Sequence, residues 1–191
     1  ATMAAGLRDP KDVASVIKYG NIGKENASEG WRALMFMAEV YGDKEKGDSI
    51  KWLETIKEGV AKFPSQDYFI ANLANYYMQK GLYDEGLAEI DKMIATNAKP
   101  YYLYVKGALH YEKQDYPAAI EALDKVIAAG GDLAADAYSK KGDIYFFPAQ
   151  KIVEENSTLS MDDPKYNSNE AKIKEAYEQA KPFYEKAKEL E

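Results

Sequence analysis

A pattern that recurs about every 34 residues limits the fold of this chain more than any other feature. Each copy carries one small residue at the same place in an apolar pattern, and successive copies lie 36, 33 and 35 residues apart. The four small residues are Ala38, Ala74, Gly107 and Gly142. A period near 34 is typical of repeats that consist of two helices joined by a turn. The sequence therefore predicts a short array of helical hairpins.

The second copy shows both helices of such a unit. The stripe of its first helix consists of Ile70, Leu73, Ala74 and Tyr77, and that of its second of Gly86, Ile90 and Met93. Both follow the spacing of one face of an α-helix, and Gly81 lies in the turn between them. A glycine inside a helix costs about 1 kcal/mol relative to alanine, so its recurrence at one position indicates a packing gain. We expect the small residue to let the paired helix approach closely.

This order of large and small positions resembles the tetratricopeptide repeat, in which a proline often ends the unit, as Pro64 does here. The resemblance covers roughly residues 27–191 and implies an all-α, right-handed superhelix of helix–turn–helix repeats. A fainter resemblance is to exported repeat proteins of the Bacteroides group. We expect one domain with repeats at 27–65, 66–98, 99–132 and 133–191. Residues 1–26 should form a linker and a helix that either caps the first repeat or is the second helix of a truncated one. Asp9-Pro10 is a good helix start, and Val13, Val16 and Ile17 form an apolar stripe before Gly20.

The last copy is longer than the others, because about 26 residues are inserted near positions 148–170. We expect its first helix to continue past a kink at Pro148, up to about residue 156. The following stretch, STLSMDDPKYNSNE, is polar and rich in turn formers. The second helix should then resume near Glu170 and kink at Pro182. Its stripe consists of Ala180, Tyr184 and Ala187.

Charge and composition exclude several classes of function. The net charge is −7 and no basic run is present, which disfavours nucleic acid and anionic membranes as partners. No stretch approaches the roughly 18 apolar residues of a membrane span, and no signal peptide is visible at the start. The absence of cysteine excludes disulfides and thiol chemistry. The compartment stays open, with a bacterial periplasm or cell envelope favoured over the cytoplasm.

Residues that could carry catalysis or bind a metal are few and scattered. His110 is the single histidine and occupies a position where other copies have tyrosine, so we expect a packed ring with no catalytic partner. The spacing of a calcium-binding loop is absent from Asp162, Asp163 and the asparagines that follow them. We therefore expect a solvated loop with a helix cap there. Asn156 opens a glycosylation sequon by pattern only. The sequence therefore predicts no enzyme, no cofactor and no metal site.

In this family the first helices line a concave face that holds a peptide or a partner helix. The candidate groove residues are Tyr68, Asn72, Asn75, Gln79, Tyr101, Tyr104 and Tyr111, with Asp136, Ser139 and Asp143 from the last copy. Asn75 matches one member of a carboxylate clamp, but its companions Ala71 and Val105 carry no charge. The resemblance therefore implies a scaffold that binds an uncharged or basic protein segment.

Two other interpretations remain open at this stage. The 16 tyrosines suit half-buried positions, so those on the inner helices could simply cover a neighbouring helix. The chain could then be a structural or self-associating cell-envelope protein. It could also be an accessory protein that handles glycans or lipids. The identity of a partner and the oligomeric state are not encoded in any motif.

Overall fold

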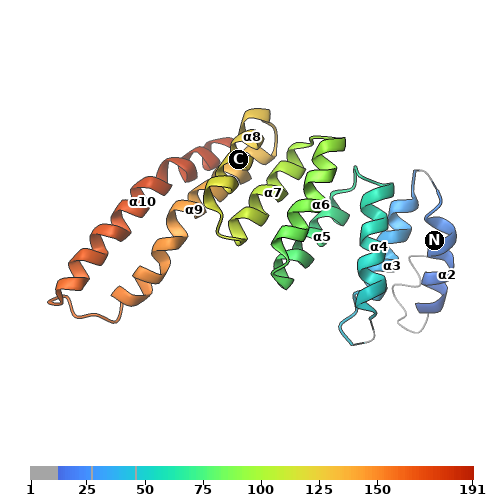
Figure 1. The fold of residues 1–191 in the computed structure, drawn as a ribbon, viewed down its shortest axis with the longest axis horizontal. Coiled ribbons are helices and arrows are strands. Elements are labelled where there is room, and N and C mark those ends of the chain that lie inside the picture. Colours follow the sequence, from blue (N-terminus) through green and yellow to red (C-terminus); the bar gives the residue numbers. More distant parts are fainter. Residues whose placement is uncertain (1–12, 27, 46) are drawn as a thin grey trace. The chain divides into compact units, whose positions relative to one another are not determined.

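The computed structural model describes residues 13–26, 28–45 and 47–191, and all regular elements among them are α-helices (Figure 1). This confirms the all-α class and a repeat-like series of helices. The chain divides into two compact units, residues 1–80 and 81–191, and each is described by itself. The second predicted repeat is split by this boundary. The predicted single domain and its superhelix therefore stay predictions.

The first unit contains α2 (Val13–Gly23), α3 (Gly30–Tyr41), α4 (Ser49–Lys62) and α5 (Asp67–Lys80), each packed on the next. Its core consists of the fully buried side chains of Leu34, Ile56, Phe69 and Leu73. Helix α2 continues past the predicted apolar stripe, through Gly20 to Gly23. Gly20 is buried inside the helix, and a β-carbon there would lie 2.6 Å from Met37. The predicted start at Asp9-Pro10 lies outside the described residues.

The second unit contains α6 (Tyr83–Thr96), α7 (Pro100–Glu112), α8 (Tyr116–Ala129), α9 (Leu133–Asn156) and α10 (Pro164–Leu190). Helices α9 and α10 run side by side as one long hairpin (Figure 1). The core beneath α7, α8 and α9 consists of Ala119, Leu123, Val126, Ala137 and Ile144. Apolar burial of this kind is the main source of stability in helical hairpins.

Local signals explain where several helices begin. Asp48 accepts hydrogen bonds from the backbone amides of Ile50 and Lys51, at 3.1 and 3.0 Å, and so caps α4. Asp115 caps α8 and Asp163 caps α10 in the same manner. Such caps satisfy backbone donors that have no partner within the helix.

The predicted role of the small residues is confirmed within both units. A β-carbon at Gly107 would lie 2.9 Å from Leu123 on α8, and one at Gly59 would lie 2.2 Å from the ring of Phe69 on α5. At Gly142 it would lie 2.6 Å from the ring of Tyr184 on α10. Ala38 and Ala74 are buried as well. These positions therefore permit helix contacts that a larger side chain would block.

The insert differs from the expectation at one end. Helix α9 does continue through Pro148 to Asn156, as predicted. The second helix begins at Pro164 rather than near Glu170, so only residues 157–163 connect the two helices. Asp163 caps this helix, and Asn169 is almost completely buried. The polar composition therefore marks a helix start rather than a long loop.

Candidate binding site

The predicted groove residues of the first unit lie along α5. Tyr68 is half-buried, and its ring meets that of Phe69 edge-on at 5.3 Å. Burial, with a smaller contribution from Glu39, raises the pKa of Tyr68. Asn72 donates its side-chain amide to the carbonyl oxygen of Tyr68 at 2.8 Å, within the same helix. Asn75 and Gln79 are exposed.

The predicted groove residues of the second unit lie along α7, except for Asp136, Ser139 and Asp143, which lie on α9. Tyr101, Tyr104 and Tyr111 are all half-buried. The rings of Tyr104 and Tyr111 also pack against the core of this unit. Part of the Tyr104 ring and part of the Tyr111 ring therefore cover neighbouring helices, as expected if the inner tyrosines serve packing. Because α5 and α7 belong to different units, a groove that both share stays a prediction.

A polar network surrounds Tyr111 and engages the predicted groove residue Asp143. The hydroxyl of Tyr184 donates to Asp143 at 2.9 Å, and the Lys140 ammonium lies 3.3 Å from the same carboxylate. The ammonium of Lys140 also lies 4.9 Å from the centre of the Tyr111 ring. Its charge is therefore paired with Asp143 and stacked on an aromatic face.

Burial and nearby negative charge make these phenols harder to ionise. Burial, followed by Asp143, Tyr116 and Glu112, raises the pKa of Tyr111 to about 12. Burial, followed by Asp136 and Asp143, raises the pKa of Tyr104. Burial and the hydrogen bond to Asp143 raise the pKa of Tyr184. All three hydroxyls therefore stay protonated to a higher pH than that of an ordinary tyrosine.

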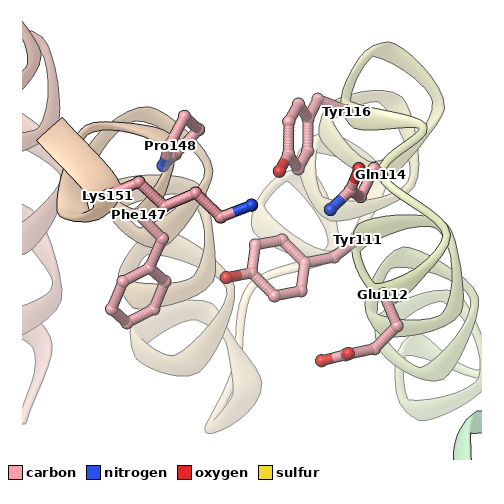
Figure 2. A pocket seen from close by; sticks show the side chains of 7 residues that line it. All are labelled: Tyr111, Glu112, Gln114, Tyr116, Phe147, Pro148 and Lys151. Carbon is pink, nitrogen blue, oxygen red and sulfur yellow. The ribbon is translucent and has the colours of Figure 1, made fainter.

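A cavity of about 470 Å³ opens where the end of α7 and the start of α8 face α9. Its walls are Tyr111, Glu112, Gln114, Tyr116, Phe147, Pro148 and Lys151 (Figure 2). Pro148 and Lys151 belong to the inserted part of α9, so the insert supplies one wall of the cavity. Its volume falls in the range of about 300–1,000 Å³ that small-molecule pockets occupy.

Three polar side chains that line the cavity make no hydrogen bond or ion pair with other described residues. Among the described residues, Glu112, Gln114 and Lys151 make no side-chain hydrogen bond or ion pair. Figure 2 shows the Lys151 ammonium and the Gln114 amide pointing into the space between the helices. These groups are solvated in the free protein and can bind a ligand.

Gln114 has an unusual backbone conformation for its residue type. Its φ is 64°, in the left-handed region that L-residues rarely adopt. Gln114 follows Gly107 by seven residues, and Gly81 follows Ala74 by the same interval with a φ of 67°. The turn between α7 and α8 therefore carries glutamine at the place where the preceding repeat has glycine.

The remaining chemical candidates, His110 and Asn156, are largely buried. The His110 side chain is 14% exposed, and its Nδ1 lies 3.3 Å from Asp115 Oδ2 without a hydrogen bond of normal geometry. The ring is largely buried, as the packed-ring interpretation expected, and Asp115 is a nearby carboxylate that the sequence did not suggest. Asn156 is 5% exposed and donates to Glu170 at 3.0 Å, so the asparagine of the sequon is buried.

The part of the chain that the structure describes contains no group of three or more acidic or histidine side chains able to hold a metal ion. Asp163 is occupied as a helix cap, and Asp162 is exposed. Along the described helices, none is both long enough and apolar enough to cross a bilayer.

Sequence reasoning missed the cavity, because four of its residues come from the α7–α8 turn, the start of α8 and the insert: Gln114, Tyr116, Pro148 and Lys151. The available signal was glutamine at a position equivalent to Gly81. It also missed a repeated ion pair between helices. Lys106 lies 2.6 Å from Asp91, and Lys141 lies 2.5 Å from Asp124. Each pair joins a first helix to the second helix before it.

Comparison with protein-family models and with curated protein sequences finds no match to this chain.

Proposed function

We propose that this chain is a non-enzymatic scaffold of the tetratricopeptide kind, which binds a segment of another protein along its first helices. The observation that carries this proposal is the row of half-buried tyrosines on α7, which ends at the cavity beside Tyr111. Tyrosine offers a large contact area with few torsions to immobilise, so it is frequent in binding hot spots.

Charge favours an uncharged or basic segment at the Tyr104 end of α7. Burial is the main cause of the raised pKa of Tyr104, and the negative charge of the exposed Asp136 adds to it, followed by that of Asp143. A field that disfavours the phenolate also favours a cation nearby. The small-residue contacts at Gly107 and Gly142 support hairpins packed in the manner of this repeat class. Asn75 and Gln79 on α5 supply exposed amides for a peptide backbone.

The experiment compares variants in binding to one purified partner. That partner is first captured with the wild-type chain and identified, and its affinity is then measured by calorimetry. Asn75→Ala and Tyr104→Leu each should weaken binding at least about tenfold in this proposal, as hot-spot residues do. Leucine keeps apolar contact with the core but removes the hydroxyl and the ring face. Lys92→Ala, an exposed change on the second helix α6, is the matched control.

Thermal unfolding of each variant separates binding from stability. The proposal fails if both groove variants bind the partner as tightly as the wild type while remaining folded. Concentration-dependent light scattering without any partner would favour a self-associating array instead. Specific binding on a glycan array, unaffected by either variant, would favour the glycan-handling alternative.

A further inference from the structure

We propose that the cavity between the α7–α8 turn and α9 binds a short peptide with free ends, whose ammonium meets Glu112 and whose carboxylate meets Lys151. This inference goes beyond the proposed function, because it assigns a ligand to the cavity whether or not the groove holds a protein segment. It rests on charge, aromatic surface and the conformation of Gln114.

The lining of the cavity carries one unpaired negative charge, Glu112, and one unpaired positive charge, Lys151. Figure 2 shows the Glu112 carboxylate and the Lys151 ammonium on different sides of the Tyr111 ring, and no ion pair joins them. The nearby charges of Lys140 and Asp143 neutralise each other at 3.3 Å. An anion could pair only with Lys151, and a cation only with Glu112. A ligand that carries both charges pairs with both side chains, which is electrostatic complementarity.

The middle of the cavity is aromatic. The ring centres of Tyr111 and Tyr116 are 6.0 Å apart, and Phe147 is 39% exposed on the facing helix. This surface suits an apolar or aromatic side chain in the centre of the ligand. A tripeptide spans about 10 Å when extended, so its two ends can reach groups on different sides of one ring.

Gln114 supplies a group for the peptide bond itself. A primary amide both donates and accepts, which matches the N–H and C=O of a peptide unit. This side chain points into the cavity and has no partner among the described residues. It is held there by a left-handed backbone, where glycine would fit without strain. Strained backbone of this kind concentrates at ligand sites.

The test measures binding of the tripeptide Ala-Tyr-Ala to the full chain by calorimetry and by amide chemical-shift changes. Four forms are compared: free at both ends, acetylated at the N-terminus, amidated at the C-terminus, and blocked at both ends. We expect the free form to bind most tightly. Each blocked end should weaken binding about two- to fivefold, the effect of one exposed ion pair. The shifts should centre on residues 111–116 and 147–151.

Two variants show which side chain meets which end. Glu112→Gln should weaken the free and amidated forms about two- to fivefold and leave the acetylated form unchanged. Lys151→Gln should weaken the free and acetylated forms by a similar factor and leave the amidated form unchanged. Glu178→Gln and Lys174→Gln, two exposed changes on α10 outside the cavity, should change none of the affinities.

Several results would overturn the assignment. Equal affinity for all four forms would show that the end charges are not recognised. If Glu112→Gln or Lys151→Gln weakened all four forms of the peptide equally, the end charges would likewise not be recognised by these side chains. Glucose or maltose displacing the tripeptide from these residues would assign the cavity to a sugar. Because this assay uses no captured partner, its failure is separate from failure of the scaffold proposal.

Discussion

Gly142 on α9 lies directly against the ring of Tyr184 on α10, where a β-carbon would approach the ring carbons to 2.6 Å. Tyr184 cannot easily move away, since its hydroxyl donates to Asp143 at 2.9 Å. The two residues are 42 positions apart, and the inserted segment lies between them. Their contact shows that the long last hairpin packs at the same small position as the shorter repeats.

This contact predicts the effect of adding one methyl group. Gly142→Ala should lower the free energy of unfolding by about 1–2 kcal/mol, because overpacking outweighs the gain in helix propensity. Urea unfolding followed by circular dichroism measures it. In a Tyr184→Ala background the same change should be neutral or stabilising, since the ring is gone. An equal loss in both backgrounds would contradict the contact.

Substitutions at the turn residues Gln114 and Gly81 should change the free energy of unfolding in opposite directions. Gln114→Gly should raise the free energy of unfolding by about 0.5–1 kcal/mol. Glycine relieves the strain of the left-handed backbone, and the greater conformational freedom of the unfolded chain offsets part of this gain. Gly81→Ala should lower it by about 1 kcal/mol, although open space surrounds this position. Thermal unfolding tests both. A loss of stability in the first variant would show that the Gln114 side chain supports the fold itself.

Tyr111 predicts a loss of stability in alkali. Its pKa is raised from the ordinary 10.0 to about 12 in the folded protein, so folding favours the protonated phenol. The stability from this shift is complete below about pH 10 and disappears as the pH rises through about 12. Tyr111→Phe should flatten this decline, and Tyr184, whose pKa is also raised, should account for part of the remainder. Urea midpoints between pH 9 and 12 measure the profile, and identical slopes in variant and wild type would refute the assignment.

The end of the long hairpin contains a buried amide that should not tolerate charge. Asn156 donates to Glu170 at 3.0 Å and is 5% exposed. Asn156→Asp would place two acceptors together and should cost about 1–3 kcal/mol at neutral pH. The exposed Asn167→Asp is the matched control and should change stability by less than about 0.5 kcal/mol. Similar effects of the two changes would mean that Asn156 is solvated.

The sequence by itself determined the helical period and the small positions. Both depend on local rules, because residues three and four apart share a helix face and only a small side chain permits a close helix pair. Ala74, Gly107 and Gly142 are all buried, as this rule requires. The candidate groove could be predicted only as a list of helix positions, and its use for binding stays a proposal.

Only the tertiary structure decided the form of the insert and the cavity beside it. The polar segment from residue 157 looks like a loop, yet from Pro164 onward it is helical, with Asn169 buried. The extended α9 then places Lys151 opposite Tyr111 and Gln114, some 40 positions earlier in the chain. Neither outcome follows from local periodicity, because each depends on which distant side chains a helix meets when it packs.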